Sequence, residues 1–144
     1  SRHDAKERIY EYKIINRIGS LSIYINKAWH IKKKLNIKLL KKGASLLEGT
    51  HDFSTFRASS CSSSTPIKKM NAVRVKKKGD EIIIEFKSKS FLQNQVRSMV
   101  GSLEYLSCGK WTLNNFRNVF KSKKRSNCAP PAPACGLYLK DVKY

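Results

Sequence analysis

Hydrophobic residues along this chain repeat at every second position in some segments, as in strands, and at helical spacing in others. Over residues 9–18, apolar and aromatic side chains fall on one face at every second position, which predicts a strand. Apolar residues then recur at helical spacing over residues 37–47, with Asn36 as a predicted N-cap and Gly49 as a predicted stop. The intervening residues 19–34 follow neither period, so a loop is expected there.

The second half of the chain predicts a hairpin, two helices and a last strand. Strands over residues 67–77 and 81–88 flank Gly79-Asp80, a pair typical of tight turns. One apolar stripe then runs from Leu92 to Leu106, as expected for a long helix. The other predicted features are a Ser-rich loop (58–64), a shorter helix capped by Thr112, a Pro/Ala loop (127–135) and a closing strand (136–144).

The order of these elements predicts the fold class. Strand, helix, strand, strand, helix and strand, with one extra helix, is the split β-α-β order of ferredoxin-like domains. We therefore expect an α+β fold, in which an antiparallel sheet carries helices on one face and leaves the other free for a ligand. With 144 residues, 40% of them hydrophobic, the chain is long enough for one domain with its own core.

Charge narrows the class of partner. The chain has 30 Lys and Arg residues against 10 Asp and Glu, a formal net charge of +20. Such an excess favours a polyanion, with nucleic acid first and an anionic membrane surface second. Cations attract phosphates, and neighbouring aromatic rings stack on unpaired bases. The candidate RNA-binding cations are Arg2, Lys32, Lys33, Lys34, Lys68, Lys69, Lys123, Lys124 and Arg125.

Residues for metal or nucleophilic chemistry are scarce. The four cysteines form no C-x-x-C pair, so no metal site is predicted, and reduced thiols are expected. His51 has no serine or cysteine partner at a recognisable spacing. Each of Asp4, Asp52, Asp80 and Asp141 is interpreted as structural, with Asp52 expected to cap a short turn.

Arg97 is the most informative single residue. It lies beside the apolar stripe of the long predicted helix. An arginine in that position either extends its guanidinium to solvent or pairs with a buried carboxylate. The residues around it leave both interpretations open.

Three segments together resemble a known family. They are SRHDAKERIYEY (1–12), LEGTHDFSTFR (47–57) and SFLQNQVRSMVGSL (90–103), the last followed by APACGLYL (132–139). In this order and spacing, over nearly the whole chain, they resemble the C-terminal half of the tRNA pseudouridine synthase A family. The resemblance implies half of the pseudouridine synthase fold over residues 1–144.

The resemblance also implies a reaction and roles for three residues. Members of this family isomerise uridine to pseudouridine at positions 38 to 40 of the tRNA anticodon arm, as cytoplasmic homodimers that need no cofactor. Tyr10 matches the tyrosine that packs on the target base and assists proton transfer. Arg97 matches the arginine that pairs with the catalytic aspartate, and Leu137 matches the leucine that lines the uracil pocket.

One family motif is missing from this sequence. The Arg-Thr-Asp-Ala-Gly stretch that carries the nucleophilic aspartate belongs to the family's N-terminal half and does not occur in these 144 residues. We therefore expect the chain alone to be inactive and to contribute the base pocket and an RNA-binding surface. The alternative is a basic RNA-binding module that keeps the fold without catalysis.

Overall fold

A computed structural model describes residues 6–16, 28–57, 65–92 and 94–144 of the chain. Arg2, Asp4 and the Ser-rich segment 58–64 lie outside these ranges. The strands are β1 (Glu7–Asn16), β2 (Trp29–Ile31), β3 (Gly49–Asp52), β4 (Ile67–Lys78), β5 (Glu81–Ser88) and β6 (Leu137–Lys143). The helices are α1 (Ile37–Leu47), α2 (Gln95–Ser107) and α3 (Leu113–Ser122).

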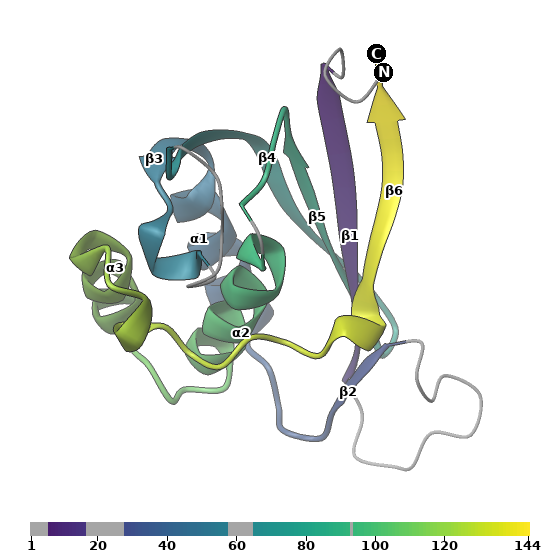
Figure 1. Ribbon diagram of the computed structural model, residues 1–144. Helices are drawn as coiled ribbons and strands as arrows, with labels where there is room; N and C mark the ends of the chain where they lie inside the picture. The colour runs from purple at the N-terminus through teal and green to yellow at the C-terminus, as the bar shows by residue number, and fades with distance from the viewer. Residues whose placement is uncertain (1–5, 17–27, 58–64, 93) are drawn as a thin grey trace.

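The sheet has the predicted split β-α-β topology. Its strand order is β2-β1-β5-β4-β3, and β6 also pairs with β1 (Figure 1). β5 therefore lies between β1 and β4, which are joined in the chain through β2, α1 and β3. β1 lies between β5 and β6, which are joined through α2 and α3. All pairings in the described sheet are antiparallel except the short parallel contact of β1 with β2.

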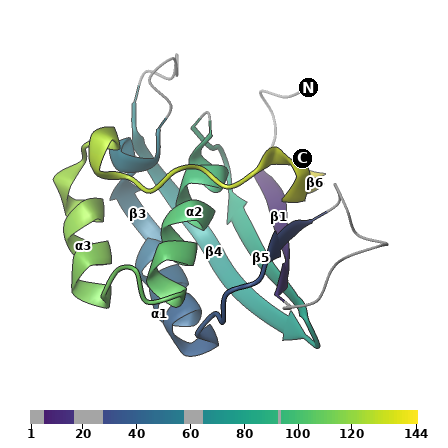
Figure 2. The same cartoon turned by 90° about the horizontal axis from the view of Figure 1, so that it is seen from below.

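All three helices cover the same face of the sheet (Figures 1 and 2). One continuous core lies between the sheet and helices α1 and α2. It includes Tyr12 and Ile14 of β1 and Phe86 of β5. The predicted caps are present, because the Asn36 side chain accepts a hydrogen bond from the backbone of Leu39 at 3.2 Å and Thr112 forms a capping box with Asn115. Within the described ranges, the helices are too short and too polar to cross a bilayer.

Two short strands were not predicted from the sequence. Residues 29–31, expected in a loop, form β2 beside β1, and Gly49–Asp52 form β3 beside β4. Strands of three and four residues are too short to show a period, and Gly, His and Asp favour strands only weakly. Pairing with longer neighbours and burial of Ile31 stabilise these segments instead.

The face of the sheet opposite the helices carries paired charges. Glu85 is only 6% exposed and accepts a hydrogen bond from Lys140 at 2.9 Å. Lys140 also lies 3.6 Å from Glu11, and Lys87 lies 3.5 Å from Glu85. Burial by itself would raise the pKa of Glu85, but the bond from Lys140 and the neighbouring lysines hold that pKa below its ordinary value. Folding therefore keeps this carboxylate ionised.

Candidate active site

A cavity of about 230 Å³ opens where the beginning of α2 meets β1 and β6. Tyr10, Arg97 and Leu137 all line it, although they come from three distant segments. It lies on the helix-covered side, since Tyr10 shares its strand face with core residue Tyr12 and Arg97 belongs to α2. The expectation that a ligand uses the opposite, open face therefore does not describe this cavity. Its other lining residues are Phe91, Leu92, Asn94, Gln95 and Val96.

Tyr10 presents its ring from the middle of β1. Its backbone pairs with Phe86 on one side and with Leu139 on the other, so two neighbouring strands fix its position. The ring meets Phe91 edge to face, with centroids 4.9 Å apart and planes at 87°. This geometry is favourable for aromatic pairs and sets the tilt of the Tyr10 ring beside the cavity.

Arg97 is held in a way that neither sequence interpretation anticipated. Its Nε donates a hydrogen bond to the carbonyl oxygen of Ala132 at 2.7 Å. Its own carbonyl oxygen accepts a hydrogen bond from the backbone nitrogen of Ala132 at 2.9 Å. Among the described residues, no carboxylate lies within 4.0 Å of the guanidinium. The guanidinium is thus half-buried and fixed by a backbone carbonyl.

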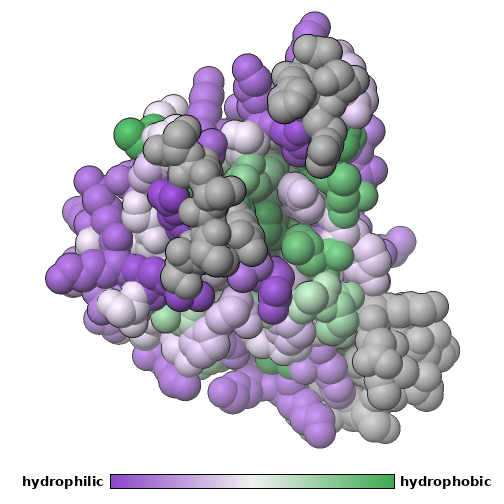
Figure 3. All heavy atoms as spheres, viewed as in Figure 1, coloured by the Kyte–Doolittle hydropathy of each residue, from purple (hydrophilic) through white to green (hydrophobic). Residues whose placement is uncertain are grey.

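Leu137 forms an apolar wall of the cavity. It is the first residue of β6, directly after the short 3-10 turn Ala134–Gly136, and it pairs with Tyr12 of β1. On the face seen in Figure 3, hydrophobic residues gather around β6 and its junction with α2, with hydrophilic residues around them. An apolar wall of this kind favours contact with an apolar or aromatic surface over contact with water.

Residues at the start of α2 complete the cavity and were missed by the sequence analysis. Asn94 adopts a left-handed backbone conformation, with φ of 61°. The Gln95 side chain is fully buried, and its Oε1 accepts a hydrogen bond from the backbone of Leu92 at 2.8 Å. Their position within one helical turn of Arg97 was the signal available in the sequence.

The predicted cations occupy different edges of the sheet. Lys68 lies opposite His51 in the β3–β4 ladder, and His51 shares a cavity of about 140 Å³ with Lys123 at the end of α3. These cations therefore lie close together, with Lys69, Lys124 and Arg125 next to them in the chain. Lys32, Lys33 and Lys34 are exposed directly after β2, at the opposite edge of the sheet, and Arg2 lies outside the described residues.

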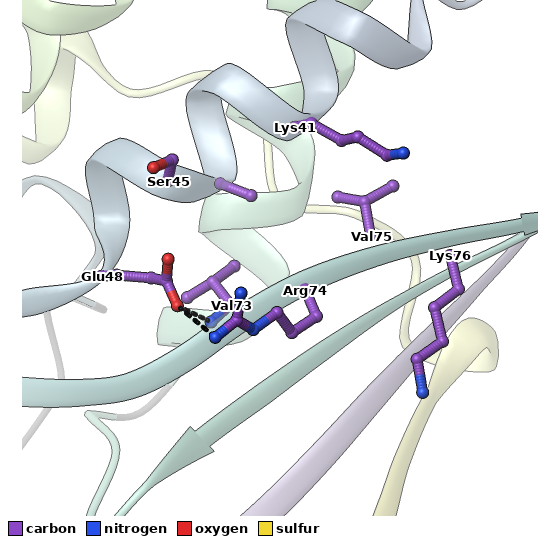
Figure 4. Close-up of a pocket in the computed structure, with 8 residues that line it drawn as sticks. Lys41, Ser45, Glu48, Val73, Arg74, Val75 and Lys76 are labelled. Atoms are coloured by element: carbon purple, nitrogen blue, oxygen red, sulfur yellow. Dashed lines mark hydrogen bonds and ion pairs between the residues drawn. The ribbon is translucent and has the colours of Figure 1, made fainter.

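Another cavity, of about 450 Å³, lies between α1 and β4 (Figure 4). Glu48 accepts a hydrogen bond from the backbone of Val73 at 3.2 Å and lies 3.8 Å from the Arg74 guanidinium. This carboxylate therefore satisfies a β4 backbone donor beyond the end of β3. Lys41 and Lys76 also line the cavity, but Lys76 extends away from α1 in Figure 4. The contacts of Glu48 indicate a structural role.

The described aspartates have local structural roles. Asp52 accepts hydrogen bonds from the backbone and hydroxyl of Ser54 at 2.9 and 2.6 Å, which confirms the expected turn. Burial alone would raise the pKa of Asp52, but these bonds and nearby Lys123 lower it. Asp80 sits in the β4–β5 turn, and Asp141 accepts a hydrogen bond from the backbone of Val142. In the described ranges, no three His, Cys, Asp or Glu residues cluster closely enough to hold a metal ion.

Comparisons with known proteins agree on one family. A sequence model described as tRNA pseudouridine synthase matches residues 44–144. Over all 144 residues the chain is 59% identical to the tRNA pseudouridine synthase A of Pelagibacter ubique (strain HTCC1062) and spans 58% of that protein. It is 42% identical to the protein of the same name in Xanthobacter autotrophicus and spans 59% of it. The identity to the namesake in Caulobacter vibrioides is 40%, with 58% of that protein spanned.

Proposed function

The chain belongs to the tRNA pseudouridine synthase family, and from this premise we propose that the protein containing it converts uridine to pseudouridine in tRNA. One observation carries the proposal. Tyr10, Arg97 and Leu137, to which the family assigns the chemistry and the base contacts, line one cavity of about 230 Å³. Since a whole water molecule takes about 30 Å³ of the liquid, a cavity of this volume is large enough to admit a single planar ring the size of a uracil base.

In this proposal Tyr10 and Leu137 contact the target base, and Arg97 acts on the nucleophile. The Tyr10 ring packs against the uracil and assists proton transfer, while Leu137 supplies an apolar wall. The Arg97 guanidinium keeps an aspartate ionised by favouring its charged form. That nucleophilic aspartate comes from a part of the protein outside these 144 residues, which agrees with the lack of an ion-pair partner for Arg97 among the described residues.

The reaction is an isomerisation, so its atoms balance without a cofactor. The bond between N1 of the uracil and C1′ of the ribose breaks, the base turns, and C5 bonds to C1′. A proton leaves C5, and N1 carries a proton in the product. The base must first leave its stack, which costs a few kcal/mol, and contacts in the cavity offset part of that cost.

The phosphates of the tRNA backbone bind to the cations at the two edges of the sheet. We propose that Lys68, Lys69, Lys123, Lys124 and Arg125 form one phosphate-binding area, and that Lys32, Lys33 and Lys34, with Arg2, form another. Phosphate contacts hold the RNA in register while the cavity reads the base. The anticodon-arm positions 38 to 40, a homodimer and a cytoplasmic location belong to the same proposal and rest on the family resemblance.

Arg97→Ala in the complete protein tests this function. We expect pseudouridine formation in a tRNA transcript to fall by at least about 100-fold, because a charge partner of the nucleophile is lost. Binding of tRNA should stay within about twofold, since the phosphate contacts remain. Arg117→Ala, an exposed arginine on α3, is the control and should keep both properties.

Two outcomes separate the candidate functions. If the complete wild-type protein binds tRNA but forms no pseudouridine, the non-catalytic RNA-binding module is the correct reading. If Arg97→Ala retains full activity, the proposed role of this arginine is wrong.

A further inference from the structure

A segment far from α2 in sequence lies across that helix. Residues 128–136, which we call the strap, run from the 3-10 turn Arg125–Asn127 that follows α3 to the start of β6 and cross α2 (Figures 1 and 2). A Cβ atom on Gly101 of α2 would lie 2.1 Å from the carbonyl oxygen of Pro130. The strap backbone therefore touches the helix backbone at a point where only glycine fits.

The strap forms hydrogen bonds with both the backbone and the side chain of Arg97. The Ala132 backbone donates to the Arg97 carbonyl and accepts from the Arg97 side chain, at 2.9 and 2.7 Å. Ala132 is fully buried. Because Nε is used in this contact, the two terminal nitrogens of the guanidinium are left for the cavity that Arg97 lines. A shift of the strap would therefore move the guanidinium.

Tyr12 anchors the strap from the sheet. Its hydroxyl donates a hydrogen bond to the carbonyl oxygen of Pro133 at 2.5 Å, and its ring is fully buried. A Cβ on Gly136 would lie 2.8 Å from this ring, so the strap also packs directly on it. Burial raises the pKa of Tyr12 above its ordinary value, so the hydroxyl keeps its proton and remains a donor.

We propose that Tyr12 is a positioning residue for the reaction: by holding Pro133 it fixes the strap, and the strap orients the Arg97 guanidinium and Leu137 at the cavity. This inference rests on the proposed function. Tyr12 itself does not line the cavity and acts through Arg97 and Leu137. It differs in this respect from Tyr10, two residues earlier on the same strand face.

Tyr12→Phe in the complete protein removes one oxygen atom and keeps the ring in the core. We expect kcat for pseudouridine formation to fall about 10- to 100-fold, because small misplacements of reacting groups have effects of that size. KM for tRNA should change less than about twofold. Tyr105→Phe is the control: this tyrosine lies near the other end of α2, where its ring packs on Trp111 at 5.2 Å, and the variant should keep wild-type kcat.

A double variant distinguishes positioning from general stabilisation. In an Arg97→Lys background, where the Nε contact to Ala132 is lost, Tyr12→Phe should lower kcat much less than it does in the wild-type background, because only its effect through Leu137 remains, although its effect on the unfolding midpoint persists. A full additional loss of kcat there would overturn the inference. So would an unchanged kcat in the single Tyr12→Phe variant.

A second measurement does not depend on activity. The Nε–H proton of Arg97, observed by NMR, should exchange slowly with water in the wild-type protein and at least about tenfold faster in Tyr12→Phe. Equal exchange rates in the two proteins would overturn the inference. If the wild-type protein forms no pseudouridine, the proposed function fails, and this measurement still decides whether Tyr12 fixes Arg97.

Discussion

Gly101→Ala places a methyl group where α2 meets the strap. The new Cβ would lie 2.1 Å from the carbonyl oxygen of Pro130, well inside the 3.0 Å below which real Cβ contacts essentially never occur. The atom in its way belongs to the backbone, so no side-chain rotation can relieve the overlap. The strap must retreat from the helix by about 1 Å, a distance that packed interiors resist.

The size of the effect follows from the contacts that the retreat breaks. The two hydrogen bonds between Arg97 and Ala132, now 2.7 and 2.9 Å long, would stretch beyond hydrogen-bond distance. The bond between the two backbones is worth about 1 kcal/mol net, and the one from the guanidinium about 2 kcal/mol. The better helix propensity of alanine offsets about 1 kcal/mol of this loss of stability. We expect the free energy of unfolding to fall by about 2 kcal/mol.

Urea unfolding of the complete protein, followed by circular dichroism, measures this loss. Gly43→Ala is the matched control, because the nearest atoms to its Cβ would be side-chain methyl groups, those of Leu103 and Leu106 at 2.7 Å, and not backbone. Ends of side chains can shift by a few tenths of an ångström where a backbone cannot, and alanine's better helix propensity offsets about 1 kcal/mol of an overpacking cost of roughly 1–3 kcal/mol, so the control should lose less stability than Gly101→Ala. A Gly101→Ala variant as stable as wild type would refute the backbone contact. A Gly43→Ala variant that loses as much would show that any added methyl has this effect.

Three further predictions concern stability. Lys140→Met should lower the free energy of unfolding at pH 7, because the folded-state pKa of Glu85, below its ordinary 4.5 despite burial, depends on Lys140. That contribution is present above about pH 4.5 and is lost as the pH falls through the folded-state pKa, so the difference measured by urea unfolding should shrink as the pH is lowered below 4.5. Thr112→Ala removes the cap of α3 and should cost about 1 kcal/mol by thermal unfolding. Glu48→Ala leaves a β4 backbone donor without its acceptor and should cost roughly 1–2 kcal/mol by urea unfolding, whereas Ser45→Ala in the same cavity should be neutral.

Local sequence patterns were sufficient for most of the fold. The predicted helix over residues 37–47 is confirmed, because its Asn36 cap and apolar stripe act within a few residues. The hairpin is confirmed for the same reason, with Gly79 at a φ of 61° in its turn. β2 and β3 were missed because strands of three and four residues form only through pairing with β1 and β4, and no short window of sequence contains both partners.

The cavity required more than local patterns. Tyr10, Arg97 and Leu137 lie on a strand, a helix and another strand, and only the family resemblance brought them together before the structure did. The sequence also offered two environments for Arg97, solvent or a carboxylate. The structure has a third, in which a carbonyl oxygen of the strap accepts from Nε. A contact to a backbone carbonyl cannot be predicted from residue types, because every residue carries such a carbonyl.

The strap gives a physical reason why two of the segments that resemble the family occur together. Residues 90–103 and 132–139 are separated in sequence, but they meet where Arg97 binds Ala132. Gly101 in the first segment is needed for the close approach of Pro130, and Gly136 in the second for the close approach of the Tyr12 ring. A change in either segment would displace the other at this contact. Read in this way, the glycines are part of the site, because they allow the strap to come close enough to hold the guanidinium and to place Leu137 at the cavity.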